Sequence, residues 1–306
     1  MQQYRDTDYA AVSAALHARE AKLLTQAMAE RMIDAATPEE SYKTLLECGY
    51  APLERCTLEN VEHALSQARR ELYREVSVLA PDKRIVELFQ IKYDYHNAKL
   101  ALKSKRTGED VSRLAMDCGR FDAQKVLRYE SGALSAAMSR AMEQAEKEAG
   151  HSGDLRMAEL LLDRACYEEM SALANETGST FLKDYVALQI DAINLRTLVR
   201  AQRMGCEDEI LAAAMLPGGR MFPTQLKGAR GDHLTALTHG TPLSAAGELA
   251  AKLLDGGGSL TEFERACDDA LMTFLQRARR TPFGPEVVVG YLGAKEAEFT
   301  AVRTIL

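Results

Sequence analysis

The strongest constraint on the fold is an internal repeat, because two segments align without a gap at an offset of 97 residues. The shared template is D-x-x-N-x-[KR]-x-x-x-[KR]-x-x-R-x-G, which runs from Asp94 to Gly108 and again from Asp191 to Gly205. Chance similarity between Lys- and Arg-rich helices is the alternative, but it would not require a shared acid, amide and closing glycine. The chain is therefore predicted to consist of related units.

A third, degraded copy of the template lies near the end of the sequence. Glu298 stands at the acid position, Ala301 replaces the Asn, and Arg303 matches the first cation. Each copy follows a helical segment of similar character, which predicts three helical repeats. Their expected bounds are 1–108, 109–205 and 206–306.

The composition predicts an all-α fold, since Ala, Leu, Glu, Lys, Arg, Gln and Met fill most segments. Residues 9–33 and residues 286–306 are each expected to form one long helix, although residues 287–289, Val-Val-Val, have the only strand-like pattern in the chain. Thr37 followed by Pro38 predicts a helix start, and Gly205 predicts a helix end.

The acid and amide of the template are expected to lie at contacts between helices. In the second copy Leu195 and Val199 form an apolar face next to Asp191, and a buried carboxylate needs hydrogen-bond partners. A structural lock suits such recurring groups better than catalysis does. The predicted lock residues are Asp94, Asn97, Asp191, Asn194, Glu298 and Arg303.

The cations of the template form a second polar stripe on the same helices. One interpretation is a solvated face paired with nearby Glu residues, and the other is a docking surface for an acidic partner. The residues concerned are Lys99, Lys103, Arg106, Arg196, Arg200 and Arg203.

Several classes of protein are disfavoured by the motifs that the sequence lacks and by its net charge. It has no phosphate-binding loop, no G-x-S-x-G elbow and no H-E-x-x-H helix, so no catalytic, cofactor or metal residues are assigned. A net charge of −7 offers no basic field for nucleic acid, and no run is apolar enough to cross a membrane. The polar start of the chain favours a cytoplasmic location over secretion.

The order of several short motifs along the whole chain carries a family resemblance. They are residues 18–24, 93–99, 185–196, 215–219, 283–285 and 295–303. With these motifs the sequence resembles the C-subunit family of V/A-type rotary ATPases and ATP synthases, whose eukaryotic counterpart is the d subunit. Ala301 departs from the Asn expected in that pattern.

The resemblance implies a funnel-like socket of three pseudo-symmetric helical units. It implies a non-catalytic central-stalk subunit, peripheral at the cytoplasmic face of the membrane, whose partners are the central-shaft subunits and the proteolipid ring. A protein of this kind would couple shaft rotation to H⁺ or Na⁺ transport without cofactors. A helical-repeat scaffold that binds an unrelated cytosolic partner is the alternative.

Overall fold

The structure is a computed structural model that describes residues 4–130, 132, 134–152, 155–206 and 208–306. All regular secondary structure within these ranges is helical, and none of these residues lies in a strand. The all-α class is thus confirmed. The chain divides into two compact units, one made of residues 1–89 and 275–306 and the other of residues 90–274.

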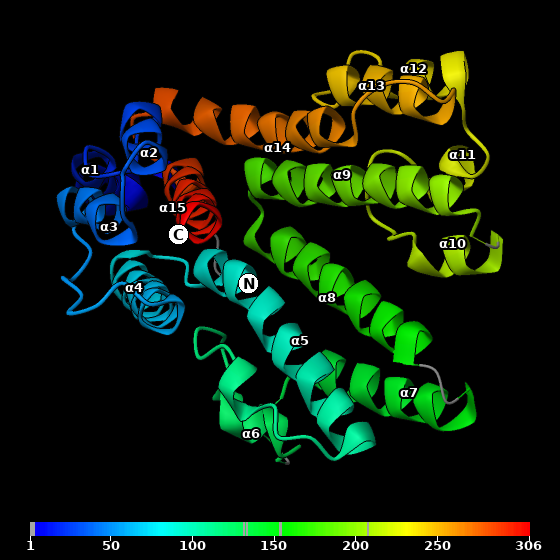
Figure 1. Ribbon diagram of the computed structural model, residues 1–306, viewed down its shortest axis with the longest axis horizontal. Coiled ribbons are helices and arrows are strands. Elements are labelled where there is room, and N and C mark those ends of the chain that lie inside the picture. Colours follow the sequence, from blue (N-terminus) through cyan, green and yellow to red (C-terminus); the bar gives the residue numbers. More distant parts are fainter. Residues whose placement is uncertain (1–3, 131, 133, 153–154, 207) are drawn as a thin grey trace. The chain divides into compact units, whose positions relative to one another are not determined.

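The first unit combines the N-terminal helices with the C-terminal one (Figure 1). Its elements are η1 (Asp6–Tyr9), α1 (Ala10–Glu20), α2 (Gln26–Ile33), α3 (Pro38–Glu47), α4 (Leu58–Leu79), the first turns of α5 (Arg84–Thr107), η3 (Arg277–Arg280) and α15 (Pro285–Ile305). Helix α15 packs against α1, α2, α4 and η3.

Close approach of α15 to the preceding turn depends on two glycines. A Cβ atom at Gly290 would lie 2.5 Å from the Cβ of Ala278, and one at Gly293 would lie 2.5 Å from the side chain of Leu275. The contact buries Leu292, Phe299 and their apolar neighbours, so α15 forms the core of the first unit.

The second unit is a succession of antiparallel and crossing helices. It contains the rest of α5, η2 (Ser112–Leu114), α6 (Ala123–Leu127), α7 (Ala136–Ser152), α8 (Leu155–Thr177), α9 (Thr180–Met204), α10 (Asp208–Ala214), α11 (Pro223–Leu226), α12 (Gly231–Thr238), α13 (Ser244–Leu254) and α14 (Leu260–Gln276) up to Phe274.

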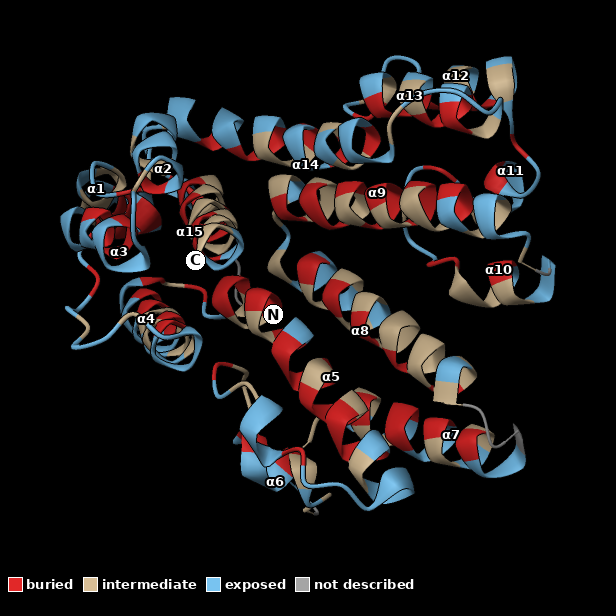
Figure 2. Ribbon diagram, viewed as in Figure 1, coloured by how far each residue is buried: buried red, intermediate tan, exposed pale blue. Residues whose placement is uncertain are grey.

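Burial in the second unit follows helical periodicity. Helix α8 buries one residue at every fourth position. These residues are Ala158, Leu162, Cys166, Met170 and Ala174. In Figure 2 buried stretches of α8 stand between partly exposed ones. Helix α9 packs against α8, α10, α11 and α13 and is buried over much of its length. The repeated template therefore lies on helices enclosed by neighbours.

The local start and stop signals are confirmed. The Thr37 hydroxyl accepts a hydrogen bond from the Glu40 amide with Pro38 in the first turn, and Gly205 ends α9 in the left-handed conformation at φ 65°.

One expectation about a single segment was wrong. Residues 9–33 form two helices, α1 and α2. The turn between them contains Leu24, whose amide donates a hydrogen bond to Glu298 of α15. The helix expected over residues 286–306 is observed as α15, and the strand-like residues 287–289 are buried inside it, where their β-branched side chains pack on the helices around α15.

Candidate functional site: the helix junctions

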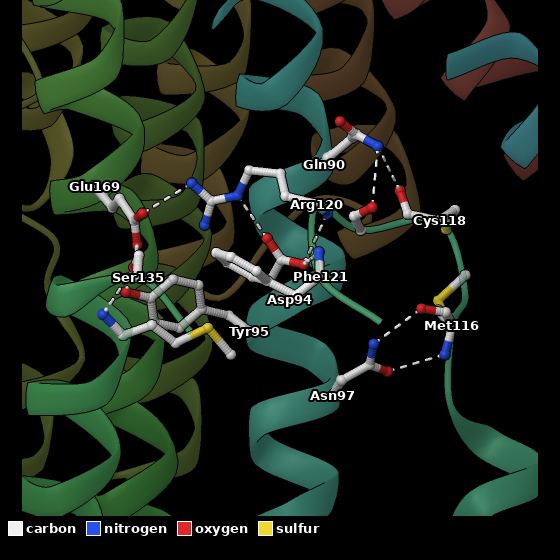
Figure 3. A network of polar contacts seen from close by, with 12 residues as sticks. Gln90, Asp94, Tyr95, Asn97, Met116, Cys118, Arg120, Phe121, Ser135 and Glu169 are labelled. Carbon is white, nitrogen blue, oxygen red and sulfur yellow. Dashed lines mark hydrogen bonds and ion pairs between the residues drawn. The ribbon is translucent and has the colours of Figure 1, made fainter. Parts of the chain in front are cut away.

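The first template copy joins α5 to the loop before α6 through the carboxylate of Asp94 (Figure 3). Its Oδ1 accepts hydrogen bonds from the Arg120 amide at 2.9 Å and the Phe121 amide at 3.2 Å. Its Oδ2 accepts one from the Arg120 Nε at 2.6 Å. Asp94 is fully buried, and this burial raises its pKa to about 6 although Arg120 acts in the opposite direction.

Asn97 binds the same loop one helical turn further along α5. Its Nδ2 donates to the Met116 carbonyl and its Oδ1 accepts from the Met116 amide, both at 2.9 Å. The side-chain amide therefore pairs with a main-chain amide and carbonyl that lie outside any helix. Figure 3 shows Asp94 and Asn97 holding the loop from one face of the helix.

Arg120 extends this junction to α8. Its Nη1 donates to Glu169 at 2.8 Å, and Glu169 also accepts from the Tyr95 hydroxyl at 2.9 Å and the Ser135 hydroxyl at 3.2 Å. The Arg120 side chain is 13% exposed and its partners Asp94 and Glu169 are 0% and 12% exposed. The network thus ties four segments of the second unit together inside the protein: α5, the loop at Arg120, Ser135 just before α7, and α8.

The second template copy repeats the geometry between α9 and the loop before α11. Asp191 accepts from the Arg220 amide at 3.1 Å and the Met221 amide at 2.9 Å. Asn194 donates to the Leu216 carbonyl at 2.8 Å and accepts from the Leu216 amide at 2.7 Å. Burial raises the pKa of Asp191, and the two amide donors oppose that effect.

A glycine makes each of these two contacts sterically possible. A Cβ at Gly119 would lie 2.1 Å from the Asp94 Oδ1, and a Cβ at Gly219 would lie 2.2 Å from the Asp191 Oδ1. Each glycine is followed by an arginine and an apolar residue, so Gly-Arg-apolar recurs at an offset of 100 residues. This second repeat was missed by the sequence analysis and would have located the partner loops.

The third copy, on α15, binds the turn between α1 and α2. Glu298 accepts from the Leu24 amide at 2.9 Å and from the Tyr50 hydroxyl at 2.7 Å, and Lys295 donates to it from the same helix. Glu298 is 5% exposed. Arg303 pairs with Glu62 of α4 at 2.6 Å, in an exposed position.

The burial and hydrogen bonding expected for Asp94, Asn97, Asp191 and Asn194 are therefore observed. The three carboxylates, of Asp94, Asp191 and Glu298, bind main-chain amides two or three residues before a short helix, α6, α11 and α2 respectively. Their role as a structural lock stays a prediction.

The cations of the first copy have acidic or carbonyl partners on the helices that follow. Lys99 contacts Asp163 of α8 at 2.7 Å, and Lys103 contacts Glu159 of α8 at 2.9 Å. Arg106 donates to the carbonyl of Ala149 in α7 at 2.7 Å.

The second copy repeats this pairing against α14. Arg196 donates to Asp268 at 2.6 Å and to the Glu264 carbonyl at 3.0 Å, and Arg200 donates to the Glu264 carboxylate at 2.7 Å. In both α8 and α14 the two acids stand four residues apart and so share a helix face. Arg203 is exposed.

Five of the six template cations thus have partners within the chain. Pairing with acids belongs to one of the two interpretations of the stripe, and the choice between them stays open. An acidic partner could reach these cations only in competition with the acids of α8 and α14 and the carbonyl of α7, so their docking role stays a prediction.

Over the described residues, no group of three or more His, Cys, Asp or Glu side chains is placed to hold a metal ion. Within the same part of the chain, no helix combines the length and apolar character that crossing a bilayer requires. What the structure does present is a repeated set of buried helix-to-loop junctions.

Comparison with known proteins matches residues 12–306 to the family described as the ATP synthase (C/AC39) subunit. The chain is 24% identical to the C subunit of the V-type sodium ATPase of Enterococcus hirae, over 98% of this chain and 93% of the relative. It is 26% identical to the C subunit of the V-type ATP synthase of Thermus thermophilus, over 97% and 92%. The C subunit of the A-type ATP synthase of Methanocaldococcus jannaschii is 22% identical, over 97% and 82%.

The fold and its junctions define an all-helical protein whose long helices bind loops through buried acid and amide side chains. The family match, which covers nearly the whole sequence, then makes the assignment specific. The chain belongs to the ATP synthase (C/AC39) subunit family of rotary ATPases, as its motif order indicated.

Proposed function

We propose that this chain is a non-catalytic central-stalk subunit that couples a rotating shaft to a membrane proteolipid ring. The observation that carries the proposal is the family match over residues 12–306, with relatives named as C subunits aligned over most of their own length. The names of these relatives include a sodium ATPase and ATP synthases, so the proposal leaves the ion, H⁺ or Na⁺, to experiment.

The repeated junctions support a mechanical role. A body that transmits torque must resist deformation, and buried carboxylates and amides that bind main-chain groups fix neighbouring segments in one geometry. In this proposal the chain forms a socket of three helical repeats, residues 1–108, 109–205 and 206–306. The junctions of α5, α9 and α15 fix the connections between these repeats.

The proposed partners are the central-shaft subunits on one side and the cytoplasmic face of the ring on the other. The shaft contact would be polar, and the exposed cations of the template are candidates for it. Lys103 and Arg200 have side chains 49% and 60% exposed, and each is held by an acid that a partner's carboxylate could replace.

Deletion of the gene tests the coupling role. ATP-driven ion uptake into membrane vesicles should be lost, while the catalytic head, released in solubilised form, should keep its ATP hydrolysis. Restoring the wild-type gene should restore uptake, which provides the control. Uptake at the parental level in the deletion strain would refute the proposal.

A helical-repeat scaffold for an unrelated cytosolic partner is the second candidate, favoured by repeat construction alone. Affinity purification from membranes separates the two functions. Co-purification of the shaft and ring subunits supports the stalk role, whereas a consistent set of other proteins supports the scaffold.

A further inference from the structure

The three template helices hold equivalent parts of the chain. At α5 and α9 the amides bound by the aspartates lie two or three residues before α6 and α11, and at α15 the bound amide of Leu24 lies two residues before α2. The three contacts can therefore be compared as versions of one junction that differ in strength.

The α15 junction makes fewer bonds to the main chain than the others. At α5 the Asp and Asn side chains make four hydrogen bonds to main-chain atoms of the bound loop, and at α9 they also make four. At α15 Glu298 accepts one main-chain bond, from Leu24. Ala301 stands where the other copies have Asn, and a methyl group neither donates nor accepts a hydrogen bond.

Side-chain pairs make up much of the remaining polar contact of α15. Tyr50 donates to Glu298, Tyr73 donates to Glu296 at 2.5 Å, and Arg303 pairs with Glu62 in an exposed position. The Arg303 pair is exposed and adds little, whereas the two tyrosine bonds are buried or partly buried, so the α15 junction depends on side-chain partners where the others use the main chain.

We propose that the α15 junction is a seam that opens while the α5 and α9 junctions stay closed. In the open state the turn at Leu24 detaches from Glu298, while the buried apolar core of α15 and the second unit stay packed. This inference rests on the proposed function in one respect, because the opening would serve to admit a segment of the central shaft during assembly.

Hydrogen–deuterium exchange on the full-length chain tests the seam directly. Peptides that contain Leu24 should exchange through an opening faster than global unfolding. Peptides that contain Met116 or Leu216 should exchange only with the second unit as a whole. Equal protection at all three junctions would overturn the proposal.

Two matched variants make the test specific to the side-chain amide that is absent at Ala301. Ala301→Asn restores the template and should slow exchange at Leu24 about fivefold, the value of one net hydrogen bond. Asn97→Ala removes the Asn side chain from the α5 junction, so that α5 lacks it as α15 does. It should speed hydrogen exchange at the Met116 amide without changing the exchange rate at the Leu24 amide. If Asn97→Ala leaves Met116 as protected as before, the amide does not decide which junction opens, and the proposal fails.

The role in assembly has its own readout. Ala301→Asn should slow association of the chain with purified shaft subunits, measured by stopped-flow or surface binding. If the seam opens but the chain does not associate with the shaft subunits at all, the proposed function is refuted and the proposal of a seam still stands. Shaft association at the wild-type rate in a variant whose exchange is slowed would refute the role of the seam in assembly.

Discussion

Asp191→Ala tests whether the buried carboxylate stabilises the α9 junction. Asp191 is 4% exposed and accepts the amides of Arg220 and Met221 at 3.1 and 2.9 Å. Its removal leaves two main-chain donors without an acceptor, at about 1–3 kcal/mol each when buried. The cost of desolvating the carboxylate, which raises its pKa, is recovered and offsets part of this loss. The expected decrease in the free energy of unfolding is about 2–4 kcal/mol.

The assay is urea unfolding followed by far-ultraviolet circular dichroism, with the midpoint compared at unchanged slope. Asp184→Ala is the matched control, since Asp184 lies on the same helix and binds the side chain of Arg220 at 2.7 Å in a more exposed position. It should cost less than about 1 kcal/mol. Equal effects of the two substitutions, or an unchanged midpoint for Asp191→Ala, would refute the structural-lock assignment.

Three further predictions concern other parts of the junctions. Gly219→Ala should destabilise by about 1–3 kcal/mol because its Cβ would meet the Asp191 carboxylate, whereas Gly150→Ala, with open space in α7, should be neutral or stabilising in the same unfolding assay. The pKa of Asp94 is raised from 3.8 to about 6, so the stabilising contribution of its protonated form is present below about pH 4 and lost as pH rises through about 6. Unfolding measured across this range should show a loss of about 3 kcal/mol that Asp94→Asn lacks, and identical pH profiles would contradict the assignment. Arg303→Gln should change stability by less than about 1 kcal/mol, because its pair with Glu62 is exposed, and a larger thermal shift would show that this pair is part of the lock.

Much of the fold could be predicted because its signals are local. Helix formation depends on side chains within a few residues, so composition and caps such as Thr37 and Gly205 were sufficient. Burial of Asp94 and Asp191 could be predicted for a related reason, since their apolar neighbours recur at helical spacing.

The error fell where a distant contact outweighed local preference. The alanine-rich pattern of residues 9–33 suggested one helix, but the amide of Leu24 binds Glu298, and the chain turns there. The helix expected over residues 286–306 formed despite the strand-like valines at 287–289, which pack inside α15 against helices from the opposite part of the sequence.

The sequence by itself determined that the chain is helical, that it carries a repeated acid and amide on its long helices, and that these groups need buried partners. Only the tertiary structure decided what the partners are: the loops at 116–121 and 216–221, the turn at Leu24, and the acids of α8 and α14 that hold the template cations. The reason is physical. A helix is stabilised by bonds between residues four apart, whereas a buried carboxylate is satisfied by whichever amide the packing of other helices brings within about 3 Å, and that choice is not encoded at the position of the carboxylate.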